Sequence, residues 1–328
     1  MTERIFVTRR IPGNGIKRLQ ESFEVEVWES EQPPTKAEII SRAKGCYGLV
    51  TLLTDRIDKT VFGALPNLRI IAQYAVGYDN IDLAEATRRA IVVTNTPDIL
   101  TETTADLTWA LIMSTARRVT EADRYVREGR WQVAWGPDLL LGADVFGKTL
   151  GIIGMGRIGS AVARRAKGFG MRILYNSHSI TDVTKSVDDT LGATRCELNT
   201  LLKESDIVTV HVPLTDETRN LISHDEFRLM KPTAVLVNTS RGAVVDEQAL
   251  YESLSRKEIF AAGLDVFEAE PTPRTNPLLS LDNVILLPHI GSATARTRSK
   301  MGEMCAENIL ALRRGEQPAN IVNPQAML

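Results

Sequence analysis

Cysteine and net charge are both scarce in this chain of 328 residues, and each scarcity excludes a class of protein. The three cysteines, Cys46, Cys196 and Cys305, are far apart and odd in number. They show neither metal-ligand spacing nor a disulfide framework, so we expect no metal site. The 39 basic side chains nearly cancel the 41 acidic ones, for a net charge of −2. A protein that binds nucleic acid or an anionic membrane through charge carries a basic excess, so we expect neither partner.

Long apolar runs are also missing. The longest are the length of a strand, which is too short for a helix that spans a bilayer. The first ten residues lack the apolar core of a signal peptide and instead predict a first strand. We therefore expect a cytoplasmic protein with reduced thiols.

Short apolar runs alternate with amphipathic runs along most of the chain, which is typical of βαβ units. The fold class predicted is α/β, with two doubly wound parallel-sheet domains. The first set of strands is expected at 5–8, 25–28, 48–51, 69–72 and 91–94, with helices such as 36–43 and 83–89 between them. The second set is expected at 149–153, 172–175, 207–210, 234–237, 261–264 and 284–287.

Two longer helical patterns suggest how the domains are connected. A single helix is expected over 102–128, capped by Thr101 and bridging the domains. A last helix over 294–313 has no partner in the second sheet, so we expect it to pack on the first domain. The predicted domains are therefore a discontinuous one of residues 1–99 plus 290–328 and a dinucleotide-binding one of residues 100–289.

A glycine-rich turn stands between a predicted strand and a predicted helix. Gly154-Met155-Gly156-Arg157-Ile158-Gly159 has G-x-G-x-x-G spacing. The first glycine permits a tight turn, the second lets the backbone approach a pyrophosphate, and the third allows close packing of helix on strand. The helix N-terminus that follows favours phosphate. The sequence therefore predicts a dinucleotide site here, the alternative being a plain βα turn.

Three side chains that could carry chemistry each follow a predicted strand: Arg241, Glu270 and His289. The carboxyl ends of parallel strands share one edge of the sheet, the edge that the glycine turn also occupies. Arginine binds a planar carboxylate bidentately, and histidine transfers protons near neutral pH. A carboxylate orients the imidazole and favours its protonated form. His224 lies in a polar helical run and is interpreted as a surface residue.

The glycine turn, Thr239-Ser240-Arg241-Gly242, residues 263–271 and Pro288-His289-Ile290-Gly291 together resemble the D-isomer-specific 2-hydroxyacid dehydrogenases. Within that family the chain is most similar to the glyoxylate/hydroxypyruvate reductases. The resemblance implies a flavodoxin-like substrate domain and a Rossmann dinucleotide-binding domain, with the active site in a cleft between them. The resemblance implies reduction of a small 2-oxo acid with NADP or NAD, with His289 as general acid, Glu270 as its partner and Arg241 as substrate anchor. It also implies a homodimer in which Trp135 enters a neighbouring subunit's substrate pocket, although Trp135 is equally consistent with an ordinary core or interface aromatic.

The resemblance also assigns binding residues. Those implied for the cofactor are Thr104, Gly154, Met155, Gly156, Arg157, Ile158, Gly159, Ser177, His178, Val212, Pro213, Thr218, Thr239, Ser240, Asp265 and Gly291. Those implied for the substrate are Leu53, Val76, Gly77, Arg241, His289 and Trp135, with backbone N–H groups of the loop 75–79 on the carboxylate.

One position departs from the family's NAD-preferring members. They place an acidic residue after the second strand of the nucleotide domain, where this chain has Ser177 followed by His178, with Lys185 further on. No carboxylate there repels a 2′-phosphate, so we expect NADPH to be preferred moderately. The open alternatives are a D-lactate, phosphite or phosphoglycerate dehydrogenase, or a non-catalytic, dinucleotide-sensing protein of the corepressor type.

Overall fold

The computed structural model describes residues 2–178 and 190–328. The chain forms two compact units. Unit 1 consists of Met1–Leu100 and Ser292–Leu328, and unit 2 consists of Thr101–Gly291. The first unit boundary lies after residue 100, one residue later than predicted, and the second lies after residue 291, two residues later than predicted. Ile290 and Gly291 stay with unit 2 because their backbone N–H groups donate to the carboxylate of Asp265 in that unit.

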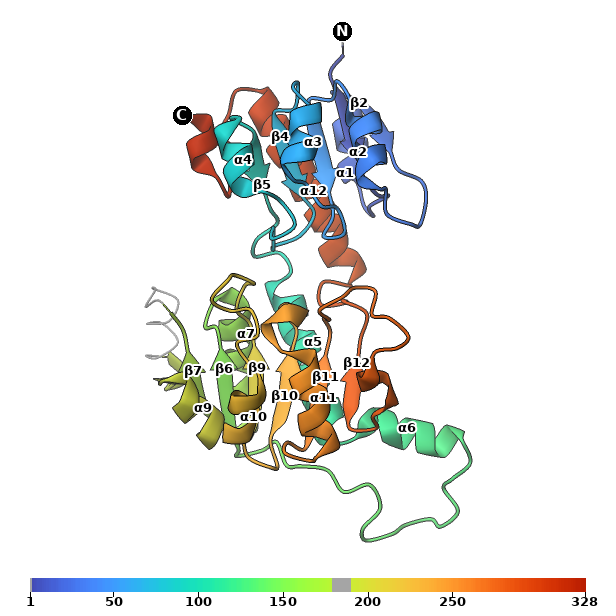
Figure 1. The fold of residues 1–328 in the computed structure, drawn as a ribbon, viewed down its shortest axis with the longest axis vertical. Coiled ribbons are helices and arrows are strands. Elements are labelled where there is room, and N and C mark those ends of the chain that lie inside the picture. The colour runs from blue at the N-terminus through green and yellow to red at the C-terminus, as the bar shows by residue number, and fades with distance from the viewer. Residues whose placement is uncertain (1, 179–189) are drawn as a thin grey trace. The chain divides into compact units, whose positions relative to one another are not determined.

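Unit 1 is a parallel five-stranded sheet with helices on both faces (Figure 1). Its strand order, β2-β1-β3-β4-β5, is the flavodoxin-like doubly wound order that we predicted. Its elements are β1 (Arg4–Val7), α1 (Gly15–Gln20), β2 (Glu24–Val27), α2 (Lys36–Ala43), β3 (Gly48–Thr51), α3 (Lys59–Ala64), β4 (Ile70–Gln73), α4 (Leu83–Arg88), β5 (Val92–Thr94), α12 (Ala295–Arg313) and the 3-10 helix η4 (Pro324–Met327).

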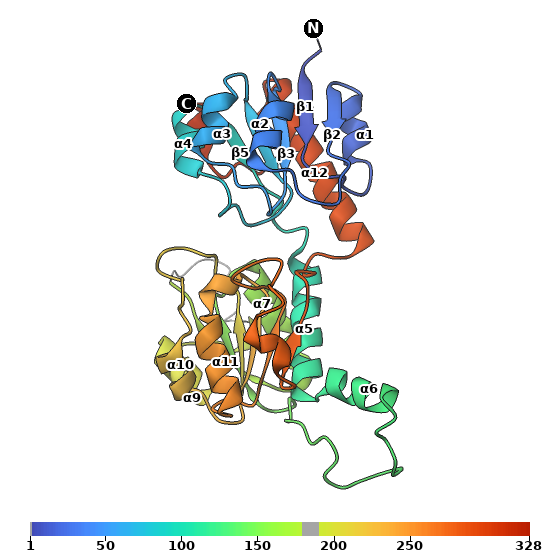
Figure 2. The same ribbon diagram turned by 45° about the vertical axis from the view of Figure 1, so that its right-hand side comes forward.

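Unit 2 is a parallel seven-stranded sheet of order β12-β11-β10-β9-β6-β7-β8, again with helices on both faces (Figure 2). Six of these strands follow the Rossmann order, and β12 adds a seventh beyond them. The elements before residue 178 are α5 (Thr101–Ala116), α6 (Val119–Arg127), β6 (Thr149–Ile153), α7 (Arg157–Ala166), η1 (Lys167–Phe169) and β7 (Arg172–Asn176). Those after residue 190 are β8 (Thr194–Arg195), α9 (Leu198–Glu204), β9 (Ile207–Val210), α10 (His224–Leu229), β10 (Val235–Asn238), η2 (Gly242–Val244), α11 (Glu247–Ser255), β11 (Ala261–Leu264), η3 (Pro277–Ser280) and β12 (Val284–Leu286).

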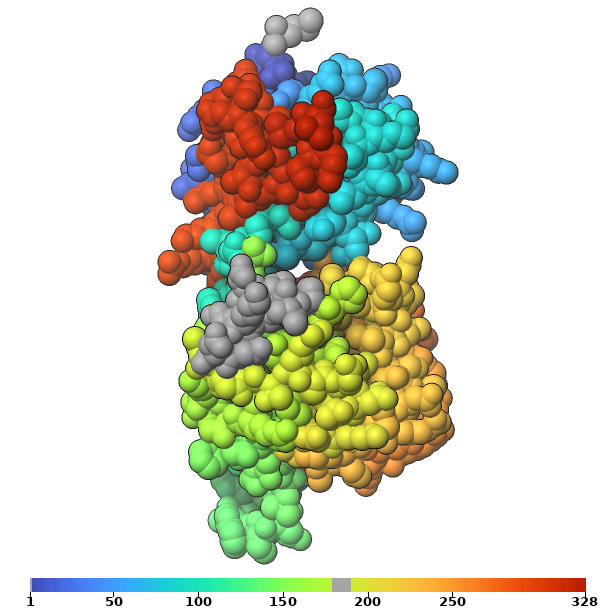
Figure 3. Space-filling view, turned by 90° about the vertical axis from the view of Figure 1, so that its left-hand side faces the viewer, coloured from blue at the N-terminus to red at the C-terminus, as the bar shows by residue number. Residues whose placement is uncertain are grey.

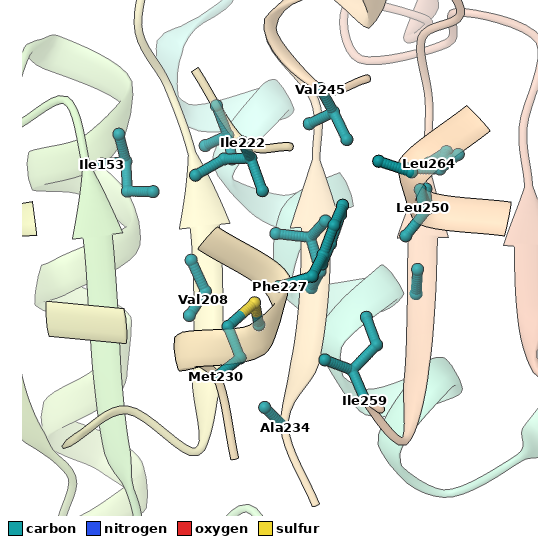
Figure 4. Close-up of a cluster of buried hydrophobic side chains, with 14 of the residues drawn as sticks. Ile153, Val208, Ile222, Phe227, Met230, Ala234, Val245, Leu250, Ile259 and Leu264 are labelled. Carbon is teal, nitrogen blue, oxygen red and sulfur yellow. The ribbon is translucent and has the colours of Figure 1, made fainter. Parts of the chain in front are cut away.

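Side chains alternate across each sheet, so every sheet has two apolar cores. In unit 2, Leu150 and Ile152 of β6 enter the core under α5 and α7, while Ile153 enters the core on the opposite face. Figure 4 shows that second core, in which Phe227 of α10 and Leu250 of α11 pack on the central strands. The near-continuous apolar strands of the sequence are thereby explained, because both faces of a parallel sheet are covered.

Helix starts in unit 1 follow from local capping. Thr35 and Glu38 form a capping box at the start of α2, with each side chain bonded to the other residue's backbone N–H. The Thr294 side chain accepts from the N–H of Thr297 at 3.2 Å and starts α12. This last helix packs on α1 and β4 of unit 1. The C-terminal part of the chain therefore completes a unit begun by the N-terminal part.

The prediction of a single helix over 102–128 is wrong. The structure has two helices, α5 and α6, with Arg118 between them in the left-handed region at φ 53°. A later part of the chain passes close to the end of α5. There Ala143 donates its N–H to the carbonyl of Ala116 at 2.7 Å, which gives a hydrogen-bond partner to the last carbonyl of α5. Thr101 is the first residue of α5 rather than its cap, and both helices belong to unit 2.

The segment from α6 to residue 140 projects from the rest of unit 2 (Figures 1 and 3). At Leu141 the chain is again beside Arg118, which donates to the Leu141 carbonyl. Helix α6 has no buried residue. Trp131, Val133 and Trp135 of this segment are 54, 69 and 76% exposed. The projecting segment therefore presents large apolar side chains on its surface.

The other predicted strands and helices agree with the structure to within one residue at either end. Strand β8 was not predicted, because two residues carry no readable periodicity. Among the described residues, no helix combines the length and the apolar character needed to cross a membrane.

Candidate active site

The residues predicted to act together come from the carboxyl ends of the strands of unit 2. Strands β6 and β9 are neighbours in the sheet, yet β7 and β8 lie between them in sequence. The chain therefore reverses its direction of winding between β6 and β9, and such a switch point is where doubly wound sheets bind ligands. The glycine turn follows β6 at this point, and residues 211–213 follow β9.

Each glycine of the turn has the surroundings that its predicted role requires. Gly154 has φ +97°, and a Cβ there would lie 2.8 Å from the carbonyl carbon of His211. A Cβ at Gly159 would lie 2.2 Å from the carbonyl oxygen of Gly154, so α7 could not approach β6. A Cβ at Gly156 would meet no atom within 4 Å. Because Gly156 opens onto free space and no side chain caps α7, a pyrophosphate fits against this turn.

His289 and Glu270 form a hydrogen-bonded pair. The Nδ1 atom of His289 lies 2.7 Å from Oε2 of Glu270, and Oε1 of Glu270 accepts from the N–H of Phe267 at 3.0 Å. Burial acts to raise the pKa of Glu270, but the bond and charge of His289, the N–H of Phe267 and the charge of Arg241 outweigh it and hold that pKa below its usual value. Glu270 is therefore an anion at neutral pH that fixes the imidazole by Nδ1 and leaves Nε2 for a ligand.

Asp265 holds the backbone of residues 289–291 in place by hydrogen bonds. Its carboxylate is buried and accepts from the N–H groups of Ile290 at 2.7 Å and Gly291 at 2.8 Å, while its carbonyl accepts from the N–H of His289 at 2.9 Å. These bonds hold His289 in the left-handed region, at φ 54°, a conformation that costs a non-glycine residue of order 1–3 kcal/mol. Burial raises the pKa of Asp265. The sequence had assigned Asp265 only to the cofactor, and this supporting contact was not predicted.

Arg241 is held in place by the end of β10. The side chain of Asn238, buried at the end of that strand, donates to the carbonyl of Arg241 at 2.8 Å and accepts from the N–H of Ser240 at 3.0 Å. Gly242 allows the segment after β11 to come close, because a Cβ there would overlap the carbonyl carbon of Phe267. The Arg241 charge is near enough to lower the pKa of Glu270. Arginine, carboxylate and imidazole thus share one edge of the sheet.

Several residues predicted for the cofactor lie beside this edge. The hydroxyl of Thr108 lies 3.0 Å from that of Thr239 and donates to the carbonyl of Thr104. The hydroxyl of Thr104 in turn donates to the carbonyl of Gly291 at 3.3 Å. After β9, the Thr218 hydroxyl donates to the carbonyl of Pro213 at 2.6 Å. Val212 contacts the glycine turn, since its Cγ1 is 2.9 Å from where a Cβ on Gly154 would stand.

The end of β7 carries Ser177 and His178, and a residue that sequence reasoning missed lies beside them. Arg195 of β8 donates from Nη2 to the carbonyl of Ser177 at 2.8 Å. The strand pairing of Tyr175 with Arg195 produces this contact. Its only sequence signal was a cation in a short polar segment, 18 residues beyond Ser177. Lys185 lies outside the described residues.

The remaining histidines do not join the pair. Burial lowers the pKa of His211 to about 3, so this imidazole at the end of β9 stays neutral. His224 is the first residue of α10, and its charge acts on Asp246 and Glu252. The described part of the chain contains no group of three or more His, Cys, Asp or Glu side chains that could hold a metal ion.

The residues predicted for the substrate are divided between the units. Leu53 follows β3 and Val76 and Gly77 follow β4, all in unit 1, whereas Arg241 and His289 belong to unit 2. Trp135 lies on the projecting segment and is 76% exposed, so it is not a core aromatic of this chain.

Comparison with known proteins decides the family. The model of the D-isomer specific 2-hydroxyacid dehydrogenase NAD binding domain matches residues 109–291, which is more than half of the chain and lies within unit 2. The chain belongs to the D-isomer specific 2-hydroxyacid dehydrogenases. The predicted family is thus confirmed, and this dehydrogenase has its nucleotide domain in the middle of the chain.

Relatives of this dehydrogenase are similar over their whole length. A glyoxylate reductase of Korarchaeum cryptofilum is 59% identical over 328 residues, covering 100% of this chain and 98% of the relative. A glyoxylate reductase of Thermococcus onnurineus is 52% identical over 330 residues, with the same coverage.

Solved structures agree with the fold. The TT0316 protein of Thermus thermophilus matches with a TM-score of 0.90 at 47% identity, covering 97% of this chain and 99% of that one. An NADPH-dependent glyoxylate/hydroxypyruvate reductase of Sinorhizobium meliloti, in complex with NADP and malonate, matches with a TM-score of 0.87 at 34% identity, covering 99% of this chain and 98% of that one.

Proposed function

We propose that this dehydrogenase reduces glyoxylate, a small 2-oxo acid, to the 2-hydroxy acid. The observation that carries the proposal is the His289–Glu270 pair, 2.7 Å apart at the same sheet edge as Arg241. The names of the relatives support glyoxylate as substrate.

The roles of the three residues follow from their chemistry. His289 donates a proton from Nε2 to the carbonyl oxygen of the substrate, since Nδ1 is engaged with Glu270. Glu270 fixes the ring and stabilises the imidazolium that must form before each proton transfer. Arg241 binds the substrate carboxylate through its planar guanidinium. Backbone N–H groups of Val76 and Gly77 would bind the same carboxylate, with Leu53 beside the substrate.

The glycine turn and its neighbours hold the cofactor in this proposal. When bound, the reduced nicotinamide cofactor supplies a hydride to the carbonyl carbon. The turn 154–159 binds its pyrophosphate, Thr104, Val212, Pro213 and Thr239 line its nicotinamide half, and Asp265 keeps residues 289–291 in position. Unit 2 is accordingly the dinucleotide-binding domain and unit 1 the substrate domain.

NADPH is the preferred cofactor in this proposal. Neither Ser177 nor His178 carries a negative charge that would repel a 2′-phosphate, and the Arg195 guanidinium lies against the Ser177 carbonyl. Glu217 disfavours NADPH, because its negative charge would repel a 2′-phosphate. A hydrogen bond from Thr215 lowers the pKa of Glu217, and the charge of His178 lowers it further, so this anion lies near the His178 imidazole. The balance favours NADPH without excluding NADH.

We also propose a homodimer formed through the projecting segment, whose exposed Trp131, Val133 and Trp135 support it. In that dimer Trp135 enters the partner's substrate pocket. We place the enzyme in the cytoplasm, which agrees with three free cysteines of which two are buried.

Rates with a panel of substrates test the function. We expect kcat/KM with NADPH to be higher for glyoxylate and hydroxypyruvate than for pyruvate, and no phosphite oxidation with NADP. A preference for pyruvate or phosphite would assign the chain to another dehydrogenase of the same family. Cofactor binding without turnover of any 2-oxo acid would favour the sensing protein.

A further inference from the structure

A chain of hydrogen bonds in unit 1, buried at Gln73 and half-buried at Asn80, joins the two loops that the proposed function assigns to the substrate. One loop follows β3 and carries Leu53, and the other follows β4 and carries Val76 and Gly77. The side chains of Gln73 and Asn80 lie between them. Neither side chain has been given a role in the reaction.

Asn80 ties its own segment to the Leu53 loop. Its Nδ2 donates to the carbonyl of Leu52 at 3.1 Å and to that of Asp55 at 2.7 Å, so it bonds to residues on both sides of Leu53. Its Oδ1 accepts from Nε2 of Gln73 at 2.8 Å. Both amide hydrogens and the carbonyl oxygen are therefore used, and the two backbone carbonyls, which only accept, fix which way the amide points.

Gln73 ties the chain of bonds to the carboxylate loop. It is the last residue of β4 and is fully buried. Besides Asn80, its Nε2 donates to the carbonyl of Gly77 at 3.3 Å, and its Oε1 accepts from the buried hydroxyl of Thr51 at 2.7 Å. Thr51 is the last residue of β3. The ends of two neighbouring strands are thus linked through side chains to both loops.

Backbone and carboxylate bonds complete the connection. Ile57 donates its N–H to the carbonyl of Asn80 at 2.9 Å, and Asp82 donates to the carbonyl of Ile57 at 2.8 Å. The Asp55 carboxylate, also buried, accepts from the N–H of Leu52 at 2.7 Å and from the hydroxyl of Thr8. The Leu53 loop therefore rests on a polar network whose members have little freedom to move separately.

We propose that Gln73 and Asn80 are positioning residues that set the separation of the Leu53 side chain from the Val76–Gly77 backbone, and through it the fit of the 2-oxo acid. This rests on the proposed function, which places the substrate carboxylate on the second loop. A substrate as small as glyoxylate offers few contacts, so a small displacement of one loop removes a large share of its binding. Because both residues belong to unit 1, the cofactor site in unit 2 is not affected.

The test compares Asn80→Leu and Gln73→Met, which keep the approximate size of each side chain and remove its hydrogen bonds. Asn323→Leu is the matched control. Asn323 is a buried asparagine of unit 1 whose side chain also makes three hydrogen bonds, to Ile91, Val93 and Thr87, but it holds β5 and not the loops. All three variants remove hydrogen bonds from unit 1 and should lower the Tm, more at buried Gln73 and Asn323 than at half-buried Asn80, so Asn323→Leu controls for lost stability.

Steady-state kinetics separates positioning from stability. We expect Asn80→Leu and Gln73→Met to raise KM for glyoxylate about tenfold or more, as for the loss of a hydrogen bond, with KM for NADPH within about twofold of the parent. Asn323→Leu should leave both KM values unchanged. If Asn80→Leu does not fold, Asn80→Ser gives the same readout, because serine admits water to the freed carbonyls while losing the direct link.

Two results would overturn the proposal: an unchanged KM for glyoxylate in folded Asn80 and Gln73 variants, or an equal rise of KM in Asn323→Leu. Failure of the proposed function looks different, since the parent enzyme would then not turn over glyoxylate at all.

Discussion

At the scale of single residues, proton transfer depends on His289. Asparagine is the sharpest replacement, because it tolerates the left-handed backbone that His289 adopts and cannot supply the proton. We expect His289→Asn to lower kcat with glyoxylate by roughly 10²–10⁴-fold, the usual contribution of general acid catalysis. Cofactor affinity, measured by fluorescence titration, should stay near that of the parent. His224→Asn is the control and should be fully active; a His289 variant with parental turnover would contradict the assignment.

The lowered pKa of Glu270 predicts a pH dependence of stability. A carboxyl group whose pKa is lower in the folded chain than its ordinary value of 4.5 stabilises the fold above that pH, and the contribution disappears as pH falls through the lowered pKa. We expect Glu270→Gln to reduce the Tm at neutral pH and the difference from the parent to shrink below about pH 4.5. In a His289→Asn background the difference at neutral pH should be smaller, because the two side chains are coupled. A Tm difference independent of pH would show that the charge of Glu270 does not matter.

Cofactor preference depends on side chains after β7 and on β8. Ser177→Asp should shift selectivity toward NADH, because a carboxylate accepts bonds from the ribose hydroxyls and repels a 2′-phosphate. Arg195→Ala should lower kcat/KM for NADPH and leave that for NADH nearly unchanged. Arg172→Ala is the matched control, since this arginine of β7 pairs with Glu204 instead. The ratio of kcat/KM for the two reduced cofactors is the measurement, and a parent strongly selective for NADH would contradict the prediction.

The catalytic residues were predictable for a physical reason, and their supports were not. Arg241, Glu270 and His289 each follow a strand, and parallel strands end at one edge, so sequence order alone places them together. The contact of Arg195 with Ser177 depends on the register of β7 against a two-residue strand, and the register of such a short strand has no sequence signal.

At the scale of elements, we expect two glycines of the glycine turn to have different roles: Gly159 is needed for the fold, and Gly156 for cofactor binding. Gly156→Ala adds a methyl group where the protein offers free space, so the fold should keep its Tm in the absence of cofactor, whereas the pyrophosphate loses its close approach. Gly159→Ala should instead lower the Tm, because its Cβ would overlap the Gly154 carbonyl.

Thermal unfolding without cofactor and a cofactor titration measure the two effects. Gly168→Ala, at a glycine with no close neighbour, should change neither. Unaltered cofactor affinity in Gly156→Ala would show that the turn does not bind the pyrophosphate.

The break between α5 and α6 shows what periodicity misses within an element. Helical residues continue through Arg117 and Arg118, so nothing in the local pattern ends the helix. The ending depends on residues 142–143 returning to the Ala116 carbonyl, a contact made across more than twenty residues. A bond of this kind belongs to the tertiary structure, which overrides local propensity.

At the scale of the whole molecule, the projecting segment predicts self-association. Light scattering should give about twice the 36.2 kDa mass of one chain. The double variant Trp131→Ser and Val133→Ser should shift the mass toward that of a monomer, because it removes apolar surface that a partner would bury. Leu279→Ser, at an exposed apolar residue elsewhere in unit 2, should have no effect. A parent that is monomeric at working concentration would contradict the prediction.

Local signals in the sequence were enough to determine the two parallel sheets, the glycine turn and the order of the catalytic residues. Apolar strands, turn glycines and strand ends are each read from a few neighbouring residues, and the winding of βα units is then fixed by chirality. The tertiary structure alone decided the support of His289 by Asp265, the approach of Arg195 to Ser177 and the linkage of the Leu53 loop to the Gly77 loop. These contacts join residues that are distant in sequence, and such contacts arise only when the chain has packed.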